Sequence, residues 1–224
     1  MIQTHDYLKT EQEKTLNTLR YNYSLAAKLF FFGMDLLAGR KDTLSKAKLL
    51  EILACIPYRE WEIRHYIKLT RKFRNSEKVN YSKKIVEWGR SAQDNEYWHL
   101  LVIHEKMKED KMKDAWYLCS FITFFAVLSY VCIAKTFAFF SQKRAFLFNA
   151  EFENHAELVY AKFVRGHLEL EDQKMENEIV KQYADVDNWA DIFRRISLDE
   201  RNHMIESFRY CGKMEYVDKY YSES

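Results

Sequence analysis

Turn-forming residues are scarce in this chain, which has five Gly and one Pro among its 224 residues. These two residue types are among those that tight turns most often require. An all-β sandwich or barrel needs a turn about every ten residues and is therefore close to excluded. Helices need far fewer turns, so the scarcity predicts an all-α fold.

Apolar residues spaced three or four apart recur along most of the sequence, as a series of amphipathic helices requires. No internal repeat and no Pro/Ser-rich linker interrupts them. We therefore expect one domain over residues 1–224, with a core at about residues 16–210 and short flexible termini. The predicted helices run approximately over Leu16–Ala38, Leu44–Phe73, Ser82–Lys108, Trp116–Ala134, Lys143–His167 and Asn188–Tyr210.

Charge and cysteine usage narrow the class of protein. The chain has 35 Lys+Arg against 33 Asp+Glu, so no large nucleic-acid footprint is expected. Its four Cys lack metal-finger spacing and lie in apolar or helical stretches, which predicts buried free thiols in a reducing compartment. The first residues form neither an apolar signal core nor an amphipathic presequence, so no targeting peptide is expected.

An uncharged apolar segment runs from Trp116 to Ala134. A helix that crosses a bilayer needs roughly twenty apolar residues, so a membrane span is one interpretation. A helix buried on all sides in the protein core is equally apolar. A third interpretation is a helix in the membrane interface, with one side on protein and the other in lipid. No second segment of similar strength accompanies it, which argues against a crossing.

The pattern Glu-x-x-His carries the clearest chemical signal. Residues three apart lie on one face of a helix, so both side chains can reach one metal ion. The sequence has three such pairs, Glu62/His65, Glu96/His99 and Glu200/His203. The second and third pairs lie in mid-helix among apolar residues, where burying Glu and His is costly unless they are paired or metal-bound.

Di-iron carboxylate bundles need one further Glu from each of two other helices. Glu51 stands in the predicted helix before the second pair, and Glu153 in the helix before the third. This order predicts a ferritin-like four-helix bundle with a di-iron centre. The predicted metal ligands are Glu51, Glu96, His99, Glu153, Glu200 and His203.

Two further features lie near the predicted ligands in the sequence, the pair Glu62/His65 and Tyr160. Glu62/His65 shares a helix with Glu51 but lies about 16 Å further along its axis, so it cannot join the same cluster. We expect it to be solvated or to lie in the surroundings of the metal. Tyr160 follows Glu153 by two helical turns on the same face, which makes it a candidate for a redox role.

At these residues the sequence resembles the alternative oxidase family, the non-haem di-iron quinol oxidases. The likeness extends from about residue 16 to residue 210 and matches all six metal positions. Its segments stand where the family has Leu-Glu-Thr-Val-Ala, Asn-Glu-Arg-Met-His-Leu, Leu-Glu-Glu-Glu-Ala and Asp-Glu-Ala-His-His. They are Leu50–Ala54, Asn95–Leu100, Phe152–Ala156 and Asp199–His203.

The resemblance implies roles for further residues. Asn95, Asp199 and Tyr160 would form the hydrogen-bonded surroundings of two irons, with Tyr160 as the catalytic residue near the redox chemistry. The arginine that the family places near the quinol appears here as Lys46, the candidate for substrate binding. The threonine before the catalytic tyrosine is Val159. Lysine donates as a point charge where arginine offers a planar fork, so these changes bear on quinol recognition.

The resemblance also implies a function, a location and partners. The protein would be a non-electrogenic ubiquinol:oxygen oxidoreductase of a respiratory chain, reducing O2 to water with four electrons. Two extra helices, the first helix and Trp116–Ala134, would lie in the membrane interface of a bacterial, mitochondrial or plastid inner membrane. Basic residues from Lys68 to Lys84 could add contact with anionic headgroups. Family members commonly pair as homodimers.

Three alternatives stay open at this point. A di-iron monooxygenase acting on a quinone precursor or another lipid is compatible with Lys46 and Val159. A ferroxidase-like protein would oxidise iron without organic turnover, but it would not need the long apolar segment. A purely structural bundle would leave six buried ionisable side chains unexplained.

Overall fold

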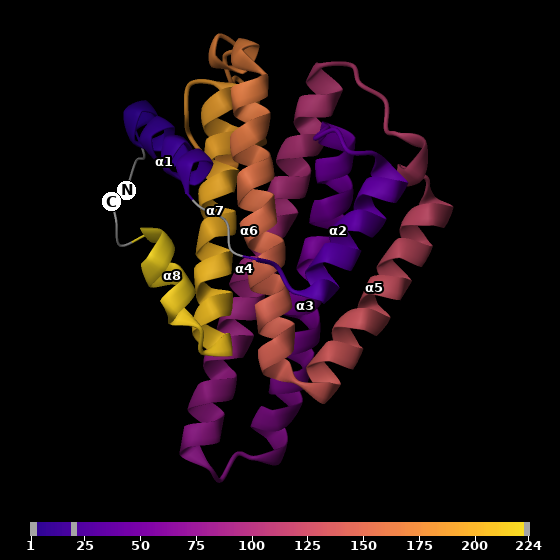
Figure 1. Cartoon of the computed structure of the whole chain (residues 1–224), viewed down its shortest axis with the longest axis vertical. Helices are drawn as coiled ribbons and strands as arrows, with labels where there is room; N and C mark the ends of the chain where they lie inside the picture. The colour runs from indigo at the N-terminus through magenta and orange to yellow at the C-terminus, as the bar shows by residue number, and fades with distance from the viewer. Residues whose placement is uncertain (1–3, 19–21, 222–224) are drawn as a thin grey trace. The chain divides into compact units, whose positions relative to one another are not determined.

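The computed structural model describes residues 4–18 and 22–221 (Figure 1). Within these ranges the chain is helical, and its one β-type contact is an isolated bridge between Lys174 and Asn188. The all-α prediction is confirmed. The described helices are α1 (His5–Asn17), α2 (Leu25–Ala38), α3 (Leu44–Arg71), α4 (Ser76–Glu109), α5 (Ser120–Phe140), α6 (Gln142–Gly166), α7 (Trp189–Cys211) and α8 (Met214–Tyr221). Short 3-10 helices cover Trp116–Leu118, Leu168–Glu171 and Val180–Gln182.

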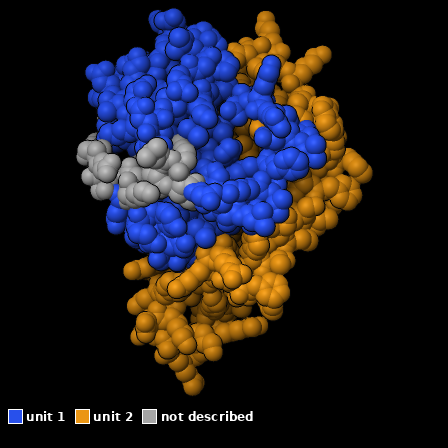
Figure 2. Space-filling view, in the orientation of Figure 1, with its two compact units in different colours: residues 1–43, 146–224 blue, residues 44–145 orange. Residues whose placement is uncertain are grey.

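The chain folds as two compact units (Figure 2). Unit 1 comprises the described residues of 1–43 and 146–224, with α1, α2, most of α6, α7 and α8. Unit 2 comprises residues 44–145, with α3, α4, α5 and the first turn of α6. A single domain and a ferritin-like bundle of four helices stay predictions.

The first predicted helix, Leu16–Ala38, is wrong in its first part. Helix α1 ends at Asn17, and α2 begins only at Leu25. The hydroxyl of Thr18 donates to the carbonyl of Lys14 at 2.7 Å, and the Ser24 hydroxyl accepts a hydrogen bond from the N–H of Ala27 at 3.3 Å. Short hydroxyl side chains favour helix termini in this way. They end one helix and begin another where apolar spacing alone had predicted continuity.

Other predicted boundaries shift for local reasons. Helix α4 begins at Ser76, earlier than predicted, because Asn75 caps it by accepting from the N–H of Lys78 at 2.9 Å. The uncharged segment opens with a 3-10 turn, and its helix, α5, starts at Ser120 and continues to Phe140. Helix α8 lies outside the helices that the sequence predicted, and so does α1 except for Leu16 and Asn17.

In unit 2, α3 and α4 pack closely. The rings of Trp61 and Trp88 stack with centroids 5.3 Å apart, and Tyr58 meets both edge-on. A Cβ atom at Gly89 would lie only 3.1 Å from the carbonyl oxygen of Tyr58. The absence of a side chain at Gly89 therefore allows this close approach of the two helices.

In unit 1, the buried guanidinium of Arg201 ties three helices together. From α7 it donates to Glu157 of α6 at 3.0 Å and to the hydroxyl of Thr15 of α1 at 2.7 Å, and it pairs with Glu11 of α1. Burial tends to raise the pKa of Glu11, but hydrogen bonds from Lys14 and Arg201 lower it overall. Helix α1 lies where the sequence predicted a short flexible terminus, and that prediction is wrong because these contacts anchor the helix to α6 and α7.

Helix α5 packs on α3, and its buried residues are Tyr130, Ala134 and Ala138. Only 17% of its most apolar 18-residue stretch is buried. The interpretation of this segment as a fully buried core helix is therefore wrong. The helix is long and apolar enough to cross a membrane. Its exposed aromatic side chains include Phe121, Phe124, Phe139 and Phe140.

Helix α2 of unit 1 also presents an apolar face outward. Leu25, Leu29, Phe32 and Leu36, spaced three or four apart, are all exposed. On its other side, Phe30 packs on Phe148 and Phe152 of α6.

The cysteine prediction holds only in part. Cys211 is buried and Cys55 is half-buried, but Cys119 and Cys132 are exposed. The two exposed thiols lie at the start of α5 and on its outward surface, where apolar sequence does not mean burial.

Candidate metal centre

Unit 2 brings three of the predicted ligands together. Glu51 comes from α3, and Glu96 and His99 come from neighbouring turns of α4. The Nδ1 atom of His99 lies 3.5 Å from Oε2 of Glu51 and 3.6 Å from Oε2 of Glu96. All three side chains are buried, and each offers a ligand atom within 4.8 Å of the others. We call these residues the unit 2 group.

Unit 1 brings the other three together in the same pattern. Glu153 comes from α6, and Glu200 and His203 come from α7. Nδ1 of His203 lies 3.7 Å from Oε2 of Glu200, and the three residues again offer ligand atoms within 4.8 Å of one another. None of the three is more than 8% exposed. We call these residues the unit 1 group.

The donor set of each group fits a transition-metal ion. Two carboxylates and one imidazole converge in each group, and carboxylate and imidazole ligands suit iron. Burying ionised carboxylates is strongly unfavourable unless positive charge lies beside them. A divalent cation balances the two carboxylates of one group, so each group can hold a metal ion.

Asn149 contacts the unit 1 group and is not among the residues predicted from the sequence. Its side-chain amide donates to Oε1 of Glu153 at 3.0 Å and to the hydroxyl of Ser207 at 3.1 Å. All three side chains are buried. The hydrogen bond fixes one carboxylate oxygen of Glu153. The signal was the spacing of four residues on one helix face, where Asn and Glu can meet.

The three residues predicted to surround the metal are Asn95, Tyr160 and Asp199, and all three are buried or half-buried. Asp199 is buried and accepts hydrogen bonds from the Tyr183 hydroxyl at 2.7 Å and from Arg195 at 2.6 Å. Asn95 is half-buried on α4. Tyr160 is buried in α6, with its ring stacked 6.3 Å from that of Phe193. Their roles around a metal stay predictions.

Lys46, the predicted substrate-binding residue, is buried in the first turns of α3. It precedes Glu51 on the same helix. A buried ammonium group is unusual and marks a polar environment at this end of α3. Its role in quinol binding stays a prediction.

The pair Glu62/His65 belongs to neither group. Glu62 accepts hydrogen bonds from Arg90 at 2.6 Å and Gln93 at 2.9 Å; burial opposes ionisation, but these bonds lower its pKa. His65 is fully buried and lies 3.1 Å from the Ser82 hydroxyl. The prediction that this pair lies outside the metal centre agrees with these contacts, but His65 is not solvated.

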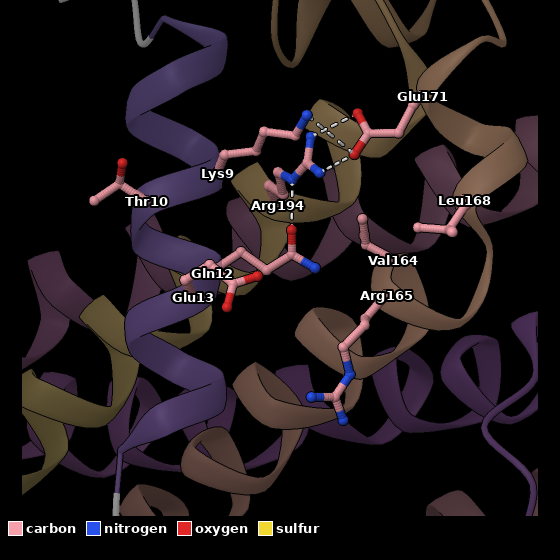
Figure 3. A pocket seen from close by; sticks show the side chains of 9 residues that line it. All are labelled: Lys9, Thr10, Gln12, Glu13, Val164, Arg165, Leu168, Glu171 and Arg194. Atoms are coloured by element: carbon pink, nitrogen blue, oxygen red, sulfur yellow. Dashed lines mark hydrogen bonds and ion pairs between the residues drawn. The ribbon is translucent and has the colours of Figure 1, made fainter.

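A third cluster, His5, Glu171 and Asp191, also has ligand atoms within 4.8 Å of one another. In this cluster Arg194 already forms ion pairs with the carboxylates of Asp191 and Glu171. Arg194 donates to Asp191 at 2.7 Å. Its guanidinium also pairs with both carboxylate oxygens of Glu171 (Figure 3). It also donates to Gln12 of α1 at 2.7 Å. This cluster is an ion-pair network that fastens α1 and the 3-10 helix Leu168–Glu171 to α7.

No known protein-family model matches the chain, and no curated protein of similar sequence was found. The resemblance to the alternative oxidase family therefore stays a prediction that rests on its motifs.

Metal content tests the two groups directly. We expect the Glu96→Ala and His203→Ala variants to lose most of the bound iron, because each removes one of three donors from its group. The control is Glu62→Gln, which alters a Glu-x-x-His pair outside both groups and should keep wild-type iron. Elemental analysis of proteins reconstituted anaerobically with ferrous iron provides the measurement. Unchanged iron in both alanine variants would contradict the assignment.

Proposed function

We propose that this protein is a membrane-bound di-iron quinol oxidase of the alternative oxidase type. The observation that carries the proposal is the pair of matching groups, each with one Glu from one helix and a Glu-x-x-His pair from another. In this proposal the unit 1 group and the unit 2 group together hold two irons as one centre. The order of the ligands along the sequence supports it, since it is the order of di-iron carboxylate bundles.

Charge balance supports iron in the ferrous state. The two groups contribute four glutamates, whose four negative charges equal the positive charge of two ferrous ions. The reduced centre would be neutral overall, which lowers the cost of burying it. All six side chains are buried, so bulk water is kept from the ligands.

The residues around the ligands would orient groups and handle protons. When bound, the di-iron centre supplies the redox chemistry, in which two quinols are oxidised to quinones and one O2 is reduced to two waters. Asn149 holds the carboxylate of Glu153 in one orientation through its 3.0 Å hydrogen bond. Tyr160, buried on the same helix, would hold or release a proton at its phenol oxygen.

The outward apolar face of α5 supports a membrane-bound enzyme. A quinol is dissolved in the lipid, so its oxidase must reach the bilayer. Exposed phenylalanines such as Phe124, Phe139 and Phe140 would be unfavourable in water and favourable in the apolar interface of a membrane. The exposed apolar side of α2 would contribute in the same way.

Oxygen uptake with a short-chain ubiquinol tests the proposed activity. Iron-loaded protein should consume one O2 for every two quinols, without hydrogen peroxide and in the presence of cyanide. Tyr160→Phe should lower kcat on the order of 100-fold, the effect of losing a positioned proton donor, while keeping its iron. Tyr66→Phe, which alters an exposed tyrosine of α3, is the control and should be unaffected.

Two outcomes would overturn this proposal. Iron-loaded protein without quinol-dependent uptake would exclude the oxidase. A product heavier than its substrate by one oxygen atom would instead identify a monooxygenase, which Lys46 in place of the family's arginine makes the second candidate.

Flotation with lipid vesicles tests the membrane face separately. A variant that combines Phe124→Ser, Phe139→Ser and Phe140→Ser should bind more than about 100-fold more weakly, since each buried phenylalanine contributes about 1.5 kcal/mol or more. A matched control changes three other large exposed side chains away from α5, Tyr66→Ser, Tyr97→Ser and Leu168→Ser. Equal loss of binding in both variants would contradict a role for α5.

A further inference from the structure

A cavity of about 490 Å³ lies in unit 2 where α3 ends and α4 begins. It is lined by Lys68, Lys72, Glu77, Lys78, Tyr81 and Ser82. Ser82 precedes Glu96 on α4 by about 21 Å of helix, so this cavity is separate from the metal ligands. Its volume falls within the range of small-molecule sites, roughly 300 to 1,000 Å³.

The charges on the cavity wall are not neutralised by ion pairs within the described part of the chain. Among the residues that the structure describes, Lys68, Lys72 and Lys78 form no ion pair with a carboxylate, and Glu77 forms none with a cation. Three ammonium groups therefore face one carboxylate around the same space. Burial, together with the charge of Arg64, lowers the pKa of Lys68. A polyanion in the cavity would relieve this repulsion.

A fixed chain of hydrogen bonds lies behind the lysines. Lys68 approaches Nε2 of His65 at 3.4 Å and Oε1 of Gln142 at 3.3 Å, and the Gln142 amide also contacts Nε2. An ammonium group can only donate, so Nε2 of His65 is the acceptor. Burial, reinforced by the charge of Lys68, lowers the pKa of His65 to about 4. At neutral pH the ring is therefore uncharged and carries its proton on Nδ1.

This chain sets the direction of the Ser82 hydroxyl. Nδ1–H of His65 donates to Oγ of Ser82 at 3.1 Å, so the hydroxyl hydrogen of Ser82 must point elsewhere. Ser82 is only 2% exposed, and among the described residues its hydroxyl forms a hydrogen bond with Nδ1 of His65 but none to an acceptor. Ser82 lines the cavity, so a ligand oxygen there can accept this hydrogen bond.

We infer that this cavity binds a phosphate group, with Lys68, Lys72 and Lys78 supplying positive charge and the Ser82 hydroxyl donating a hydrogen bond. The phosphate belongs to a phosphate monoester, either a free phosphorylated compound or a lipid headgroup. Tyr81, whose ring packs 5.7 Å from that of His65, adds a second hydroxyl to the wall.

The donor set favours phosphate over a carboxylate. A phosphate monoester has three terminal oxygens and close to two negative charges, which match three ammonium groups and a hydroxyl. Lysine binds phosphate well as a point charge, whereas carboxylates are best matched by the planar fork of arginine. No arginine lines this cavity.

Calorimetric titration of the full-length protein with glycerol 3-phosphate tests the inference. Wild type should bind saturably, and the Lys72→Ala/Lys78→Ala double variant should bind at least about tenfold more weakly, as expected for lost charge-assisted hydrogen bonds. Both lysines are exposed, so the fold should tolerate the change. Ser82→Ala should weaken binding as well. The control is Lys83→Ala/Lys84→Ala, which removes equal charge from exposed lysines outside the cavity.

A parallel arm uses phosphatidylcholine vesicles with and without phosphatidic acid. Tighter binding to phosphatidic acid that depends on Lys72 and Lys78 would identify a lipid headgroup, whereas saturable binding of glycerol 3-phosphate identifies a free phosphate ester. Phosphate can also coordinate a metal, so the lysine variants decide the result. The inference is wrong if neither probe binds, or if the control pair weakens binding as much as the cavity pair.

Discussion

Six ionisable side chains buried in a helical protein set the main physical constraint on this chain. Carboxylates removed from water are unstable unless cations or hydrogen-bond donors compensate them. In unit 2 the buried carboxylates of Glu51 and Glu96 lie beside His99. In unit 1 the buried carboxylates of Glu153 and Glu200 lie beside His203. Elsewhere in the protein, arginine side chains compensate buried carboxylates. Arg201 forms ion pairs with Glu11 and Glu157. Arg194 forms ion pairs with Asp191 and Glu171. In the unit 1 group and the unit 2 group, a bound metal ion would supply positive charge of the same kind.

Much of the helical fold could be predicted from sequence because few residues that favour turns interrupt the apolar periodicity. The central parts of α3, α4, α6 and α7 follow that prediction, and so do the two Glu-x-x-His pairs, whose spacing is a local property of a helix. The predicted helix boundaries are wrong where hydrogen bonds of polar side chains, rather than apolar periodicity, decide where a helix ends or packs. Thr18 and Ser24 separate α1 from α2, and α1 is anchored by the polar residues Glu11 and Thr15, which look solvent-facing until Arg201 is placed beside them. The spacing of Asn149 and Glu153 on one helix face is a local signal, but the contact of Asn149 with Ser207 joins residues that are distant in sequence and could not be predicted.

Unit 2 combines two surfaces of opposite character. Helix α5 presents phenylalanines that favour an apolar environment, while the cavity between α3 and α4 gathers lysines around a hydroxyl whose direction His65 fixes. The apolar sequence of α5 could not tell burial from exposure, because both a core helix and an interfacial helix are apolar. The cavity likewise depends on a contact between Ser82 and His65, which neither residue's local sequence predicts.

The most direct test of the central proposal is Mössbauer spectroscopy of protein loaded with ⁵⁷Fe, because it separates one coupled centre from two independent ions. A di-iron centre built from both groups predicts two irons per chain, magnetically coupled in the oxidised protein. Both ions should lose that coupled signal when either His99 or His203 is replaced by alanine. Two uncoupled high-spin ferric signals, each abolished only by the variant in its own group, would contradict the proposal.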